Sequence, residues 1–137
     1  LVLITCNAAA RLRDVLASVP FADEIILVDS GSTDDTAAIA TTFGAQVVHH
    51  GWMGFGPQKS HAVSLARHDW VLCLDADEAL SPQLANSIRG VFGKGVPDYP
   101  VYRFARSSMA RVTRTTTPVF SARTAPAGQT ISCMSMS

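Results

Sequence analysis

Two short runs of apolar residues, 25–28 and 70–74, constrain the fold of this chain more than any other feature. Neither run contains a charged residue, and each is followed directly by an aspartate, Asp29 or Asp75. A strand with one face in water alternates apolar and polar residues, whereas an unbroken apolar run is typical of a strand covered on both faces in a parallel sheet. We therefore expect both runs to be buried strands of such a sheet.

Strand and helix signals alternate along the first 104 residues. Apolar residues recur with a helical period from Leu12 to Val19, and Pro20 stops that helix. The expected strands cover 1–5, 25–28, 46–49, 70–74 and Val101 to Phe104, and the expected helices cover about 12–19, 33–43 with an N-cap at Ser32 or Thr33, 58–67, and 82–91 after a Ser81 cap. Repeated strand–helix units predict an α/β fold with an open, mostly parallel sheet and helices on both faces.

The composition changes after residue 104. Residues 1–104 carry all eleven acidic side chains and seven basic ones, whereas 105–137 contain four arginines, no acid and twelve Ser or Thr. The apolar positions of 105–137 show neither helical nor strand periodicity. We expect one domain over 1–104 and an irregular or disordered tail over 105–137.

The charge balance and the length of the apolar runs limit the partners and the location. Eleven basic and eleven acidic side chains give a formal charge of zero, so no overall basic field favours nucleic acid. No apolar run reaches the eighteen or so residues of a membrane-spanning helix, and residues 1–5 show no basic leader. We expect a cytoplasmic protein with no nucleic-acid partner.

Polar side chains follow three of the expected strands. They are Thr5 and Asn7 after the first strand, Asp29 and Ser30 after the second, and Asp75 and Asp77 after the fourth. Open parallel sheets bind ligands beyond the carboxyl ends of their strands, so we expect a site there. Asp29 suits a hydrogen bond from a ribose hydroxyl or a base N–H, or it starts a turn and caps the next helix. No G-x-G-x-x-G follows the first strand, which argues against a dinucleotide cofactor.

The acidic pair Asp75 and Asp77 is the most specific chemical feature of the sequence. Two carboxylates at a strand end can bind a hard dication, and Mg²⁺ typically takes one or two carboxylates together with substrate phosphates. The alternative is a solvated acidic turn before the next helix. Lys59 either reaches a phosphate or is a solvated lysine at a helix start. Trp52 and Phe55 either stack on a sugar or base, or cover part of a core.

Four segments of the chain form a longer pattern. They are Thr5-x-Asn7, residues 23–34 (DEIILVDSGSTD), residues 54–59 (GFGPQK) and residues 69–78 (DWVLCLDADE). In this order and spacing, over residues 1–104, they resemble family 2 glycosyltransferases, and most closely the bacterial lipopolysaccharide-core glycosyltransferases. The resemblance implies a GT-A fold, whose Rossmann-like half binds a nucleotide-sugar, usually a UDP-sugar.

The resemblance also implies roles for the residues at the strand ends. Mg²⁺ or Mn²⁺ would bind the D-x-D motif, with Asp77 favoured over Asp75 as the direct ligand. The remaining assignments place Thr5, Asn7, Asp29 and Ser30 around the nucleoside, Asp75 at the ribose or the metal, and Lys59 near the diphosphate. Family members generally invert the anomeric centre, and a carboxylate base in the second half of the domain activates the acceptor hydroxyl. The implied acceptor is a lipopolysaccharide core or another glycolipid, with peripheral contact at the inner face of the cytoplasmic membrane.

The chain departs from the family pattern in two places. Cys6 and Ala8 stand where the family often has an aromatic residue and Glu, which puts stacking of the base in doubt. After Phe104, the sequence lacks three segments that relatives carry: Tyr-Pro-Asp, Arg-Leu-Phe-Arg and His-Glu. A one-base shift of the reading frame permits all three, and residues 130–136 then read Asp-Asp-Leu-Val-His-Glu-His. We expect either a frameshift between about Phe104 and Val112 or a genuine unrelated tail.

Three functional interpretations follow. The favoured one is the donor-binding half of an inverting, metal-dependent sugar transferase for lipopolysaccharide core or other cell-envelope glycans. Whether this chain itself transfers sugar is not predicted, because we expect it to lack the acceptor half. The second is a catalytically inactive fragment or a nucleotide-binding remnant. The third is a phosphotransferase with Asp75 as nucleophile and Asp77 as acid, disfavoured because Ala79 stands where that class usually has Thr or Val. No general base is assigned in any of them.

Overall fold

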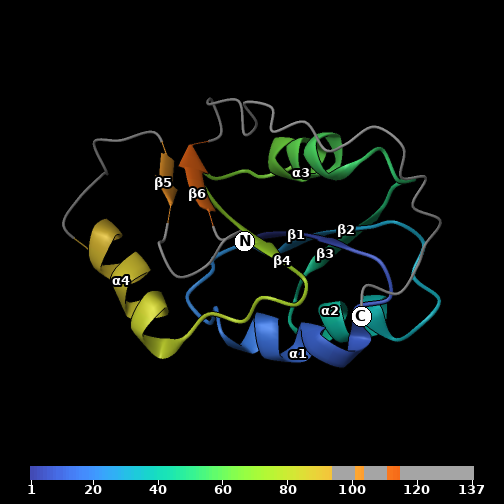
Figure 1. The fold of residues 1–137 in the computed structure, drawn as a ribbon, viewed down its shortest axis with the longest axis horizontal. Coiled ribbons are helices and arrows are strands. Elements are labelled where there is room, and N and C mark those ends of the chain that lie inside the picture. Colours follow the sequence, from blue (N-terminus) through green and yellow to red (C-terminus); the bar gives the residue numbers. More distant parts are fainter. Residues whose placement is uncertain (94–100, 104–110, 115–137) are drawn as a thin grey trace.

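The computed structural model of the chain describes residues 1–93, 101–103 and 111–114, and it shows a sheet flanked by helices (Figure 1). The elements are, in chain order, β1 (Val2–Thr5), α1 (Ala9–Ala17), β2 (Ile26–Asp29), α2 (Thr36–Thr42), β3 (Gln46–His49), α3 (Phe55–Ser64), β4 (Trp70–Asp75), α4 (Pro82–Phe92), β5 (Val101–Arg103) and β6 (Arg111–Arg114). The sheet order over these residues is β3-β2-β1-β4-β6-β5. β1 to β4 pair in parallel, whereas β6 pairs antiparallel with both β4 and β5. The predicted α/β fold with a mostly parallel sheet is confirmed.

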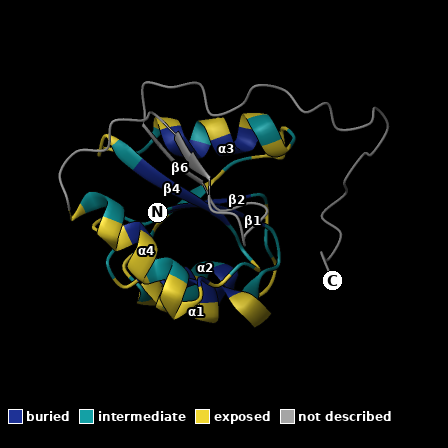
Figure 2. Cartoon of the chain, turned by 60° about the vertical axis from the view of Figure 1, so that its left-hand side comes forward, coloured by how far each residue is buried: buried dark blue, intermediate teal, exposed yellow. Residues whose placement is uncertain are grey.

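Helices cover both faces of the sheet, because successive residues of a strand point to opposite sides. Leu3 of β1 belongs to one buried cluster with Leu12 of α1 and Ile88 of α4. Ile4, the next residue of β1, belongs to a second buried cluster with Ala62 of α3. Figure 1 accordingly shows α3 on one side of the sheet and α1, α2 and α4 on the other. In Figure 2, β4 is mostly buried between these layers, and the outer faces of α1 and α4 are exposed.

The register of the parallel strands brings their polar ends to one edge of the sheet. Thr5 lies opposite Asp29 in the β1–β2 pair, and Ile4 lies opposite Asp75 in the β1–β4 pair. His49, at the end of β3, lies opposite Asp29 on the other side. The carboxyl ends of four strands therefore meet at the edge where the sequence predicts a site.

Three helices begin at residues other than those expected. α2 begins at Thr36 and not after a cap at Ser32 or Thr33, because Ser32 binds Asp29 and the backbone N–H of Thr33 donates to Asn7. α1 begins at Ala9 and α3 at Phe55, each about three residues before its expected start. The cap of α4 is confirmed, since Ser81 Oγ accepts a hydrogen bond from the backbone N–H of Leu84 at 3.2 Å.

The structure places two strands near and beyond residue 104. β5 confirms the strand expected from Val101, whereas β6 lies within the segment expected to be irregular. β6 has only one apolar residue, Val112, and pairs with the edge of β4 through backbone hydrogen bonds, which need no apolar period. The remainder of the expected tail, and the region of the expected frameshift between Phe104 and β6, lie outside the described residues. In the part of the chain that the structure describes, no helix has the length and hydropathy to cross a bilayer.

Candidate functional site

A cavity of about 160 Å³ opens at the carboxyl ends of β1, β2 and β4. Five of the residues that the sequence predicts for a site line it: Thr5, Asn7, Ser30, Asp75 and Asp77. The other two predicted residues, Asp29 and Lys59, are buried and meet the cavity through Thr5 and Asp75, their respective partners. The structure therefore brings all seven residues together in one place.

A larger cavity of about 370 Å³ lies at the opposite, amino ends of the strands, between β4 and α4. Its charged residues include Glu24, whose carboxylate already binds the guanidinium of Arg67 at 2.7 Å. Ligands of open parallel sheets bind at the carboxyl ends of the strands. The smaller cavity is therefore the candidate site.

Asp29 organises the floor of this cavity. Its Oδ1 accepts hydrogen bonds from Thr5 Oγ1 at 3.1 Å and from Ser32 Oγ, and its Oδ2 accepts from the backbone N–H groups of Gly31 and Ser32. Burial alone would raise the pKa of Asp29, but the hydrogen bonds, led by those from Ser32, outweigh burial and lower the pKa below its usual value. His49 Nδ1 lies 3.4 Å from Oδ2. Asp29 is thus a buried carboxylate that holds Thr5 and the following loop in place.

Asn7 joins the loop after β1 to the loop after β2. Its backbone N–H donates to Ser32 Oγ at 2.8 Å, and its Oδ1 accepts from the backbone N–H of Thr33 at 2.8 Å. Asn7 has a φ of 50°, a left-handed conformation that asparagine tolerates better than most residues. A strained backbone held by its surroundings is common at functional sites.

Asp34 reinforces the same junction between the loops after β1 and β2. Its Oδ2 accepts from the backbone N–H of Ala9 in α1, and its Oδ1 accepts from the backbone N–H of Thr36 in α2, both at 3.0 Å. One carboxylate therefore binds the first turns of two helices. Burial would raise the pKa of Asp34, but the hydrogen bonds, first that of the Thr36 hydroxyl, lower it.

Lys59 and Asp75 form an ion pair at the side of the cavity. Lys59 Nζ lies 2.5 Å from Asp75 Oδ1, and the two side chains are 8% and 21% exposed. α3 supplies the lysine and the end of β4 supplies the aspartate, so the pair ties the helix to the sheet. Lys59 is thus neither a solvated lysine nor remote from the acidic pair.

The carboxylates of Asp75 and Asp77 fit a hard divalent cation only if a bound ligand supplies further oxygen atoms. Among the residues that the structure describes, no cluster of three His, Cys, Asp or Glu could hold a metal by itself. Mg²⁺ often keeps waters and takes one or two carboxylates plus phosphate oxygens, which two aspartates can satisfy. Asp77 is exposed and lines the cavity, whereas one oxygen of Asp75 is occupied by Lys59. The donor set therefore suits a cation that a phosphorylated ligand helps to bind, with Asp77 the freer carboxylate.

Gln58 is a site residue that the sequence analysis missed. Its side chain is completely buried; Nε2 donates to Ser30 Oγ at 3.0 Å and to the carbonyl of His50 at 3.2 Å, and Oε1 accepts from the backbone N–H of Met53 at 3.3 Å. The amide thus links the end of β2 to the loop between β3 and α3. The only signal in the sequence was its place in the segment 54–59, beside Lys59.

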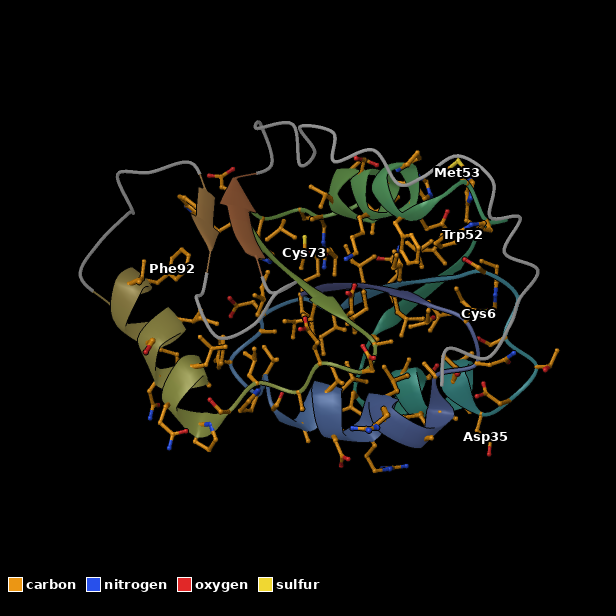
Figure 3. All side chains as sticks on the ribbon, viewed as in Figure 1. Cys6, Asp35, Trp52, Met53, Cys73 and Phe92 are labelled. Carbon is orange, nitrogen blue, oxygen red and sulfur yellow. The ribbon has the colours of Figure 1, made fainter. Side chains whose placement is uncertain are left out.

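The loop that Gln58 holds carries two aromatic side chains to the cavity. Trp52 and Phe55 both line it, with ring centroids 4.9 Å apart and planes at 87°. They are 36% and 39% exposed, so they do not cover a core, which was the alternative left open from the sequence. Figure 3 shows Trp52 and Cys6 near the same end of the sheet.

Comparison with known proteins places this site in a family context. The sequence model of the family described as "Glycosyl transferase family 2" matches residues 1–131, a stretch that runs past residue 104. An uncharacterized glycosyltransferase from Rickettsia felis is 45% identical over 111 residues, 80% of this chain and 39% of the relative. The lipopolysaccharide core biosynthesis glycosyltransferase LpsC from Rhizobium meliloti is 33% identical over 87 residues, 60% of this chain and 32% of LpsC. The chain therefore spans about two fifths or less of the length of these relatives.

A solved structure shows the same fold. Glucosyl-3-phosphoglycerate synthase from Mycobacterium tuberculosis, in complex with UDP, superposes with a TM-score of 0.51 and 32% sequence identity. The match covers 56% of this chain and 32% of the synthase. A further structure of that enzyme contains Mn²⁺, UDP and glucosyl-3-phosphoglycerate, with a TM-score of 0.49.

Proposed function

The chain belongs to glycosyltransferase family 2, and from this membership we propose that its cavity binds the nucleotide-sugar donor, most simply a UDP-sugar, of a metal-dependent, inverting sugar transfer. The observation that carries the proposal is the convergence of Thr5, Asn7, Ser30 and the acidic pair on one cavity at the carboxyl ends of the parallel strands. The superposable synthase, which binds UDP, supports a uridine nucleotide as the ligand.

Different side chains of the cavity would bind the nucleoside, the cation and the diphosphate. Thr5, Asn7 and Ser30 offer hydroxyl and amide groups to the nucleoside, and the buried Asp29 holds the first of them in place. When bound, Mg²⁺ or Mn²⁺ supplies positive charge against the leaving diphosphate, and Asp77, with Asp75 as second ligand, would hold it. Lys59 fixes the orientation of Asp75 and adds a positive charge beside the diphosphate position.

Inverting transfer also needs a general base for the acceptor hydroxyl. We assign that role to none of the described residues, so the proposed function of this part of the chain is donor binding. Turnover would also require groups that bind and activate the acceptor. Donor binding without sugar transfer is the second candidate function, since the cavity residues assigned here all serve the donor.

The cellular role is inferred from the likeness to LpsC, which its name places in lipopolysaccharide core biosynthesis. We propose a role in lipopolysaccharide core or other cell-envelope glycan synthesis, with a glycolipid acceptor and peripheral contact with the inner face of the cytoplasmic membrane. A phosphotransferase that uses Asp75 as nucleophile is disfavoured, because Lys59 already binds Oδ1 of that carboxylate.

Isothermal titration of the chain with UDP tests the proposal. We expect binding in Mn²⁺ that EDTA abolishes and that Asp77→Asn weakens at least about tenfold, since a charge-assisted ligand is lost. Asp14→Asn, which removes the same charge from an exposed position of α1, should bind UDP like the unaltered chain. Absence of UDP binding in Mn²⁺, or equal binding by Asp77→Asn, would overturn the proposed function.

A further inference from the structure

The described lining of the cavity includes one aromatic surface, which has no role in the donor binding proposed above. Of the residues that line the cavity, the aromatic ones are Trp52 and Phe55, which meet edge to face. Each keeps more than a third of its surface exposed. Rings that remain exposed at a cavity suit contact with a ligand, because burying them against it removes apolar surface from water.

The loop holds these rings in a defined position. Gly54, just before α3, has a φ of 100°, which a residue with a Cβ adopts only with strain. The carbonyl of Gly54 accepts a hydrogen bond from the backbone N–H of Gln58 at 3.0 Å, and the side chain of Gln58 binds both ends of the loop. The aromatic pair is thus preorganised, so little conformational entropy is lost when a ligand stacks on it.

The first strand offers no competing ring. Cys6 and Ala8 line the cavity after β1, and neither can stack on a planar group. The carboxylates of Asp75 and Asp77 make another part of the lining unsuitable for a neutral base, and suitable for a cation with its phosphates. The cavity therefore has an acidic part and an aromatic part, which match the two ends of a nucleoside diphosphate.

On the basis of the proposed function, we propose that the nucleobase of the donor stacks on the Trp52–Phe55 pair. Gln58 is the positioning residue of this surface. Stacking uses the π face that every base has, so the pair contributes affinity for the base without selecting uracil over other bases. Selection of the base would rest on the hydrogen-bonding groups of Thr5, Asn7 and Ser30.

Two probes separate the base from the phosphates. UDP contains both parts, whereas inorganic pyrophosphate contains only the part that the acidic pair and a cation would bind. In Mn²⁺, we expect Trp52→Ala to weaken UDP about 5- to 150-fold, the range that stacking of one base is worth, and to change pyrophosphate affinity less than twofold. Trp52→Phe, which keeps a ring, should restore most of the UDP affinity, whereas Trp52→Leu should not.

Fluorescence gives a readout that a merely structural loop would not produce. The chain has two tryptophans, and Trp70 packs against Phe92 of α4, away from the cavity. In a Trp70→Phe variant, whose thermal unfolding should show an intact fold, UDP should quench Trp52 emission and pyrophosphate should not.

The outcomes distinguish the stacking proposal from the function on which it rests. If the unaltered chain binds UDP and Trp52→Ala and Phe55→Ala bind it equally well, stacking is wrong and donor binding stands. If Trp52→Ala loses UDP and pyrophosphate to the same extent, the loop only supports the fold of the site and stacking is again wrong. If the unaltered chain binds pyrophosphate but not UDP, or neither, both proposals fail.

Discussion

Lys59 Nζ lies 2.5 Å from Oδ1 of Asp75, and both side chains are largely withdrawn from solvent. The pair places a fixed positive charge at the end of β4, within the acidic part of the cavity. In the proposed function, this charge would reduce the repulsion between the two carboxylates and the diphosphate of the donor. It also leaves Asp77 as the carboxylate with more freedom to bind a metal.

Removal of the lysine should destabilise the fold. Lys59→Met leaves Asp75 partly buried without its cation, and we expect a loss of about 2 kcal/mol in the free energy of unfolding, between the values for exposed and fully buried pairs. Urea unfolding measures it. Adding Asp75→Asn should recover part of the loss, since the unpaired charge is gone. Arg89→Met, at an exposed position of α4, should change stability by less than about 0.5 kcal/mol; an equal effect of both single variants would contradict the prediction.

The stability of the chain should fall in acid partly through Asp29. The folded-state pKa of this carboxyl is lower than its ordinary value of 3.8, so its contribution is fully present above about pH 5 and is lost as pH falls through 3.8 and then through the folded pKa. Urea unfolding between pH 2 and 6 checks this. Asp29→Asn should flatten the dependence, whereas Asp14→Asn, on the exposed face of α1, should leave it unchanged. Parallel pH profiles for the unaltered chain and Asp29→Asn would refute the assignment.

The amide of Gln58 should control the order of the loop between β3 and α3. Gln58→Met keeps the shape of the side chain but leaves Ser30, His50 and the backbone N–H of Met53 without their partner, at an expected loss of about 1–3 kcal/mol. Hydrogen exchange should show faster exchange of the Met53 amide. Ser60→Ala, at an exposed position of the same helix, is the matched control. Unchanged exchange at Met53 in Gln58→Met would show that the amide does not hold the loop.

Neighbouring aspartates should differ in their effect on stability. Asp34→Ala removes hydrogen bonds to the first turns of α1 and α2, so we expect a loss of about 1–3 kcal/mol, in the range of one or two lost caps. Asp35→Ala changes the same charge at a residue whose side chain caps nothing, and should lose less than about 0.5 kcal/mol. Thermal unfolding compares the two. Similar losses would mean that only the charge near the helix ends matters.

The sequence predicted the parallel strands and the sheet edge at which the candidate cavity lies, because both depend on local patterns. The apolar runs ending at Asp29 and Asp75 identify buried strands, and parallel pairing then brings their ends together. The start of α2 was predicted less well, since Ser32 and Thr33 both bind Asn7, which is distant in the sequence. Only tertiary structure decides between such partners.

The contacts of Lys59, Asp34 and Gln58 were not predicted for the same reason. Each binds residues from an element far along the chain, and no spacing rule links Lys59 to Asp75 or Asp34 to Ala9. β6 was missed because its antiparallel pairing with β4 and β5 rests on backbone hydrogen bonds and needs no apolar pattern. The expected frameshift stays a prediction that sequencing of the coding DNA tests; the family match extends past that region to residue 131.

Electron paramagnetic resonance of Mn²⁺ tests the central claim most directly, because only the free ion gives the strong six-line signal. The account predicts that the chain with UDP removes more free Mn²⁺ than the sum of what UDP and the chain remove separately, that uridine cannot replace UDP, and that Asp77→Asn with UDP removes no more than that sum. If the chain with UDP removes no more Mn²⁺ than the sum of its separate components, the carboxylates beyond β4 do not join a cation to the diphosphate, and the account is wrong.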